Sequence, residues 1–195
     1  MTTLAFALAA TIKHDGHGGV ADLLATPEEA AAWLTEHAQV LGLGRFLYPN
    51  GEEILPNTWE ELVQIRRAVR ALFARAVAPG APSKADAGQL MDVEDALRLV
   101  NEAADELGTT HLEWAEVPVL RWAHRTEDPV ALLIGAVGRS AIDFLTGPDR
   151  ARLRACPAAR CVKYFLQDDP RQTWCSPACG NRERVNRHYR KRTSG

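Results

Sequence analysis

Four cysteines carry the clearest chemistry in this 195-residue chain, and all of them lie in one short segment near its C-terminus. Their spacing is Cys-x4-Cys, then thirteen residues, then Cys-x3-Cys. Structural zinc takes four such ligands in a tetrahedron, and two short loops that each supply two thiolates satisfy that geometry with little backbone strain. The predicted metal ligands are Cys156, Cys161, Cys175 and Cys179.

Paired cysteines have other uses, and the choice among them depends on the cellular compartment. In a secreted protein an even cysteine count indicates disulfides, whereas close pairs in a cytosolic protein indicate metal. The first apolar run, Leu4–Ile12, is too short to span a bilayer and has no basic residue before it. We therefore expect a cytoplasmic protein with no membrane partner and Zn²⁺ as its cofactor. A redox-active or disulfide-bonded cysteine set, and another metal, stay as alternatives.

The segment that follows the last cysteine is strongly basic and contains no proline, which predicts a helix. Residues 150–195 hold 12 basic and 3 acidic residues, whereas residues 1–149 hold 11 basic and 22 acidic ones. We expect Val185 and Tyr189 to face the cysteine module, which leaves a cationic face suited to phosphate groups. A solvated tail docked on the acidic part of the chain is the alternative. The predicted nucleic-acid contacts are Arg182, Arg184, Arg187, Arg190, Lys191 and Arg192, extended by Lys163 and Arg171.

Helices should make up most of the acidic first part of the chain. Four polar residues stand where helix N-caps are expected, each followed by apolar residues at helical spacing. These predicted helix starts are Thr26, Thr58, a position near Asp86, and Asp128. Residues 111–124 alternate like two short strands around Pro118, which predicts a hairpin. The periodicity of Leu4–Ile12 does not distinguish a strand from a helix.

The charge reversal near residue 148 predicts two units. Thr146-Gly147-Pro148-Asp149 ends a predicted helix and lies where the charge changes sign. We expect an N-terminal domain at residues 1–147 and a zinc module with a basic helix at residues 148–195. The fold class is then α+β and mainly α, with a small β element in the N-terminal domain.

The cysteine segment also resembles a known family. Cys179-Gly180-Asn181-Arg182 spells the signature of CGNR zinc fingers, and the preceding Trp174–Ala178 is similar to that family as well. The four cysteines match its metal ligands residue by residue. In that family the finger commonly follows an ABATE domain, and residues 1 to about 145 resemble one in order and length. The resemblance implies a bacterial transcription regulator that responds to stress.

These observations favour a one-component regulator that is not an enzyme. Its expected partners are DNA and, at the N-terminal domain, a small-molecule effector, a second copy of the chain or another protein. Motifs of P-loops, serine hydrolases and zinc proteases are absent from the sequence. The alternatives are a zinc-thiolate redox switch, and a ligand-binding or enzymatic N-terminal domain whose finger contacts RNA or protein. Arg66, Arg67 and Arg70 share one predicted helix and could reach a pocket for an anion.

Overall fold

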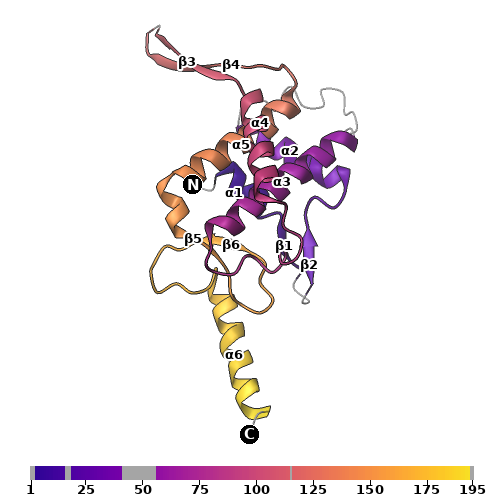
Figure 1. The fold of residues 1–195 in the computed structure, drawn as a ribbon, viewed down its shortest axis with the longest axis vertical. Helices are drawn as coiled ribbons and strands as arrows, with labels where there is room; N and C mark the ends of the chain where they lie inside the picture. Colours follow the sequence, from indigo (N-terminus) through magenta and orange to yellow (C-terminus); the bar gives the residue numbers. More distant parts are fainter. Residues whose placement is uncertain (1–2, 16–18, 41–55, 115, 194–195) are drawn as a thin grey trace.

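The structure is a computed structural model that describes residues 3–15, 19–40, 56–114 and 116–193. Helices dominate it, with three small antiparallel strand pairs, so the predicted class is confirmed. A helical body occupies the middle of the molecule, a hairpin leaves one end, and a basic helix leaves the other (Figure 1). The elements are α1 (Leu4–Ala9), β1 (Ile12–His14), β2 (Val20–Asp22), α2 (Pro27–Val40), α3 (Pro56–Ala76), α4 (Val93–Glu106), β3 (Thr109–Trp114), β4 (Pro118–Ala123), α5 (Pro129–Thr146), a 3₁₀ turn (Pro148–Arg152), β5 (Leu153–Ala155), β6 (Tyr164–Leu166) and α6 (Pro177–Thr193).

Two of the four predicted helix starts are confirmed by their capping contacts. The Glu29 backbone N–H donates to the Thr26 hydroxyl, and the Thr26 N–H donates to the Glu29 carboxylate, which completes a capping box at the start of α2. The Asp128 carboxylate accepts from Val130 N at 3.0 Å at the start of α5. Each capping contact joins residues at most three positions apart, so local sequence alone determines it.

The other two helix starts were wrong by a few residues. α3 already begins at Pro56, so Thr58 is a buried residue of its first turn rather than a cap. α4 begins at Val93 with Asp92 as its N-cap, not near Asp86. The reason is tertiary, because the Asp86 carboxylate binds the guanidinium of Arg70 and is not free to cap a helix.

α5 forms the centre of the N-terminal domain and packs closely against α4. A Cβ on Gly138 would lie 2.7 Å from the Val100 carbonyl oxygen, and one on Gly135 would lie 2.9 Å from that of Ala103. These glycines therefore allow the two helix backbones to approach each other. Among the described residues α5 is the one helix long and apolar enough to cross a membrane. Its run from Leu132 to Gly138 is buried, which is the pattern of a core helix.

The predicted hairpin is confirmed, with β3 paired to β4 in antiparallel register. The N-terminal apolar run, which periodicity left open, contains helix α1 and then strand β1. β1 pairs with β2, a ladder that the sequence did not predict. The core of the domain includes aromatic contacts among Phe6, Phe73 and Phe144.

Candidate metal centre and basic helix

Two short segments bring the four cysteines together. Cys156 directly follows β5, and Cys161 ends a tight turn in which its backbone N–H donates to the Ala158 carbonyl at 2.9 Å. The Cys156 N–H donates to the Lys163 carbonyl, which closes this first knuckle before β6. Cys175 lies in the loop before α6, and Cys179 lies in the first turn of that helix. The structure thus places two of the four cysteines on each of two knuckles.

The four sulfur atoms lie at the separations that a tetrahedral metal requires. All of them are within 4.8 Å of one another. The Cys161 and Cys175 sulfurs are 3.6 Å apart, and those of Cys175 and Cys179 are 3.7 Å apart. A tetrahedral ion with metal–sulfur distances of about 2.3 Å would separate its ligands by about 3.8 Å. These distances are too long for disulfides, whose sulfurs are about 2.05 Å apart, so the cluster fits a metal site.

Close contact among the thiols shifts their pKa values in opposite directions. Hydrogen bonds with Cys161 and Cys175 lower the pKa of Cys156 to about 2, whereas the hydrogen bond to Cys156 raises the pKa of Cys161 to about 11. The pKa of Cys175 is also raised, first by its hydrogen bond to Cys156, then by that to Cys161 and by burial. Without a cation the cluster therefore keeps protons, which a divalent metal would displace on binding.

The start of α6 is built around the second knuckle. The Ser176 hydroxyl accepts from the Cys179 N–H at 3.3 Å, as an N-cap does, and Pro177 occupies the first helical position. The Trp174 ring packs over Gly180, where an added Cβ would lie 3.2 Å from the indole. A side chain at position 180 would therefore press on the indole unless the ring shifts by a few tenths of an ångström, so the contact favours glycine here.

A single carboxylate ties α6 to the first knuckle. Glu183 accepts from the Ala159 N–H at 2.7 Å. Beyond it the helix extends away from the body (Figure 1). The expectation that Val185 and Tyr189 face the module was wrong, since they are 53% and 62% exposed. Both side chains therefore lie on the exposed part of α6.

The arginines of α6 present their charge to solvent. Arg184, Arg187 and Arg192 are exposed, and Arg182 is half-buried. Among the described residues none of these four forms an ion pair. Lys163 and Arg171 are exposed on the module itself. The remaining two predicted contacts, Arg190 and Lys191, belong to α6, but their side chains lie outside the described part of the chain.

A buried polar network joins the cysteine module to the N-terminal domain. Arg70 of α3 donates to both carboxylate oxygens of Asp86, at 2.7 and 3.0 Å. The Tyr164 hydroxyl of β6 donates to the same carboxylate at 2.7 Å. Ser83 donates to the Val162 carbonyl at 2.7 Å and accepts from Arg70. Burial, the Asp86 charge and the hydrogen bond to Asp86 together raise the pKa of Tyr164, so its hydroxyl stays protonated and remains a donor. No local sequence pattern indicated this network.

Family comparisons match these two parts of the structure. Residues 2–148 match the ABATE model, described as "Putative stress-induced transcription regulator", and residues 152–192 match the CGNR zinc finger model. The first match alone covers more than half of the chain. The chain belongs to the ABATE family. Comparison with curated proteins found no match.

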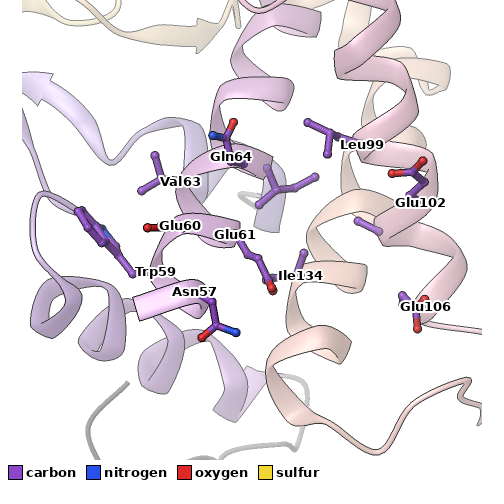
Figure 2. A pocket seen from close by; sticks show the side chains of 12 residues that line it. Asn57, Trp59, Glu60, Glu61, Val63, Gln64, Leu99, Glu102, Glu106 and Ile134 are labelled. Carbon is purple, nitrogen blue, oxygen red and sulfur yellow. The ribbon is translucent and has the colours of Figure 1, made fainter. Parts of the chain in front are cut away.

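The ABATE domain contains an open pocket of about 600 Å³ between α3, α4 and α5 (Figure 2). Its apolar wall includes Trp59 and Val63 from α3 and Leu99 from α4. The Trp59 indole N–H donates to the Leu24 carbonyl, so its polar atom is satisfied. Four carboxylates stand among the described lining residues, which include no basic residue: Glu60, Glu61, Glu102 and Glu106.

A second pocket of about 340 Å³ is lined by the three arginines that had suggested an anion site. Arg66 and Arg70 are buried, but their guanidinium groups already pair with Asp22 and Asp86. Arg67 is exposed. Because resident carboxylates occupy the two buried cations, the structure does not favour an anionic ligand here.

Proposed function

We propose that this ABATE-family chain is a one-component transcription regulator that binds DNA through α6 in the bacterial cytoplasm. We assign it a binding role rather than a catalytic one. The observation that carries the proposal is an exposed helix whose arginines lack acidic partners among the described residues and whose first turn contributes Cys179 to the metal cluster. Zn²⁺ bound by the four thiolates would fix the direction of α6, which lowers the entropic cost of ordering the helix on a polyanion.

The chain's own residues divide the work at this interface. Glu183 and the Trp174–Gly180 contact hold the base of α6 against the module. Arg184, Arg187 and Arg192 then face solvent, where they can donate paired hydrogen bonds to phosphate oxygens. Such contacts position a protein on DNA but carry no sequence information, so base recognition falls to other side chains of the same helix.

DNA binding is tested by fluorescence anisotropy on a labelled duplex of mixed sequence, titrated at several salt concentrations. If about six phosphate contacts form, the log–log slope of affinity against salt should be about −5. Replacing both arginines in Arg184→Gln/Arg187→Gln should reduce the magnitude of that slope by roughly 2. Arg139→Gln, an exposed arginine of α5 at a distance from the module, serves as the matched control and should leave it unchanged. A slope near zero for the wild type, or stronger binding to RNA, would contradict the proposal.

We propose that the effector of this regulator is an apolar organic cation bound in the pocket of Figure 2. The acidic lining supports a positively charged ligand, and the Trp59 ring supports an aromatic or quaternary ammonium group. Calorimetry with an aromatic quaternary ammonium compound and an aromatic carboxylate of similar size tests this. Glu61→Gln/Glu106→Gln should weaken binding of the cation, whereas Glu94→Gln, outside the pocket, should not. Equal binding of cation and carboxylate would contradict this assignment.

A thiolate redox switch is the second candidate. Cys175 is the one ligand that is only partly buried, and it borders a cleft of about 540 Å³ between module and domain. A metal-bound cysteine is held as a thiolate, and a thiolate within reach of solvent is one that peroxide can oxidise. Mild hydrogen peroxide followed by a colorimetric zinc assay should release metal in parallel with loss of DNA binding if the switch operates. Retention of metal at peroxide concentrations that oxidise free thiols would exclude it.

A further inference from the structure

The β3–β4 hairpin stands away from the helical body at the end opposite to α6 (Figure 1). Every residue of β3 is exposed. Its base is fixed at Gly108, whose φ of +83° is open to glycine and where an added Cβ would lie 2.0 Å from the Ala123 carbonyl oxygen. The hairpin is therefore a projecting arm whose base has a defined backbone conformation, and it is not part of the core.

The register of the arm sorts its side chains into two faces. Leu112 is opposite Leu120, and Trp114 is opposite Pro118, so these four residues share one face. His111 opposite Arg121 and Glu113 opposite Val119 make up the other face. The Arg121 guanidinium pairs with the Glu113 carboxylate at 3.1 Å across that second face. One side of the arm is thus apolar and the other is charged.

The apolar face is the largest group of exposed hydrophobic side chains among the described residues. Leu112 is 71% exposed, Trp114 74% and Leu120 60%, and Val117 in the turn is 64% exposed. A two-stranded hairpin is at best marginally stable alone in water, and an apolar patch of this kind marks an interaction surface. The arm gains stability only when this face is covered.

We propose that the covering partner is a second copy of this chain, whose arm packs face to face with the first. The apolar face carries no charged residue among Thr110, Leu112, Trp114, Pro118 and Leu120, so two identical faces meet without like charges in contact. Because the face is apolar and the described residues on it carry no charge, it can pack against an identical face, as a two-fold interface requires.

The size of the face sets the strength of the dimer. Covering it on two copies buries roughly 800–1,000 Å² in total, which is below the roughly 1,200 Å² of stable specific interfaces and in the range of weak, transient ones. The dimer is therefore weak and reversible. Since the arm and α6 lie at opposite ends, dimerisation leaves both basic helices free, and one dimer can engage a polyanion at two points (Figure 1).

Sedimentation velocity of the zinc-loaded full chain without DNA tests the proposal, which does not depend on DNA binding. From about 1 to about 300 µM the wild type should shift from monomer to dimer, as expected of a small interface. Leu120→Glu and, separately, Leu112→Glu should stay monomeric over this range. His111→Glu, on the charged face of the same arm, is the matched control and should dimerise like the wild type.

Two further readouts keep the test decisive. Melting temperatures of all three variants should equal that of the wild type, because the arm lies outside the core. Dimerisation should persist in 0.5 M NaCl, since no charged residue lies on the contact face. A wild type that stays monomeric throughout, or a Leu120→Glu variant that dimerises as well as the wild type, would overturn the proposal.

Discussion

Different interactions stabilise the ABATE domain and the finger. The domain buries a large apolar core that includes tilted ring contacts of Phe73 with Phe6 and Phe144. The finger's own buried cluster is small and contains three of the four cysteines of the candidate metal site, joined by Ala158 and Phe165. A segment of that size cannot supply enough apolar burial, so metal binding must replace it. We therefore expect the ABATE domain to stay folded when the metal is removed, whereas the finger should unfold.

The boundary between the two regions is nevertheless shared. Leu153 and Tyr164, which follow the end of the ABATE match, are buried in the main core of the domain. The Tyr164 ring meets Phe73 edge to face, with centroids 5.6 Å apart, and lies 5.2 Å from the Arg70 guanidinium carbon. Tyr164 therefore couples the finger directly to the ABATE domain. Four experiments measure the strength of this coupling.

Metal removal should have the largest effect. A structural zinc site contributes roughly 10–16 kcal/mol of binding free energy at neutral pH, which the finger loses with its metal. Cys179→Ser, or chelation of the wild type, should unfold α6 while α3, α4 and α5 stay helical. Circular dichroism and stoichiometric metal analysis measure this, with Ala159→Ser in the first knuckle as a control that keeps the metal. Retention of α6 in metal-free protein would show that apolar packing suffices.

Breaking the shared network at its buried cation should have the next largest effect. Arg70→Met leaves the Asp86 carboxylate buried beside Tyr164 without a countercharge and removes the bond to the Ala9 carbonyl. Loss of one partner of a buried pair costs about 3–5 kcal/mol. Urea unfolding should show this loss, and metal affinity should fall with it. Arg67→Met, an exposed neighbour on α3, should change neither quantity.

Removal of one hydroxyl gives a smaller and more selective test. Tyr164→Phe keeps the ring contact with Phe73 but loses the hydrogen bond to Asp86, at a cost of about 1–2 kcal/mol. This cost should appear in urea unfolding of the zinc-loaded protein and vanish in the metal-free protein, where β6 no longer holds the tyrosine in place. An equal cost in both states would mean that Tyr164 belongs to the domain alone.

Features that depend on residues close in sequence could be predicted from the sequence, whereas contacts between residues far apart in it could not. The ligand set, the capping box at Thr26 and the β3–β4 hairpin depend on residues close in sequence, and all three were predicted. The Asp86–Tyr164 bond joins residues 78 positions apart and arises only when β6 packs on α3, so no local pattern reports it. The exposure of Val185 was missed because helical periodicity gives the face of a residue but not where packing ends.

The Asp22–Arg66 pair gives the smallest effect and the cleanest contrast, because both partners lie in the ABATE domain and their hydrogen bonds go to other residues of that domain. Burial alone would raise the pKa of Asp22, but hydrogen bonds from Arg66 and from the Leu24 N–H outweigh it and lower that pKa below its usual value. A lowered folded-state pKa stabilises the protein above about pH 4 and stops doing so as the pH falls through the folded value.

The stability difference between wild type and Asp22→Asn should therefore be full at neutral pH and shrink below about pH 4. The carboxylate is one-third exposed, so solvent screening keeps the difference modest. Urea unfolding at several pH values measures it. At neutral pH, where the finger still binds metal, the difference should be the same with and without zinc, in contrast to that of Tyr164→Phe. A zinc-dependent Asp22 effect would mean that coupling from the finger extends one turn along α3, from Arg70 to Arg66.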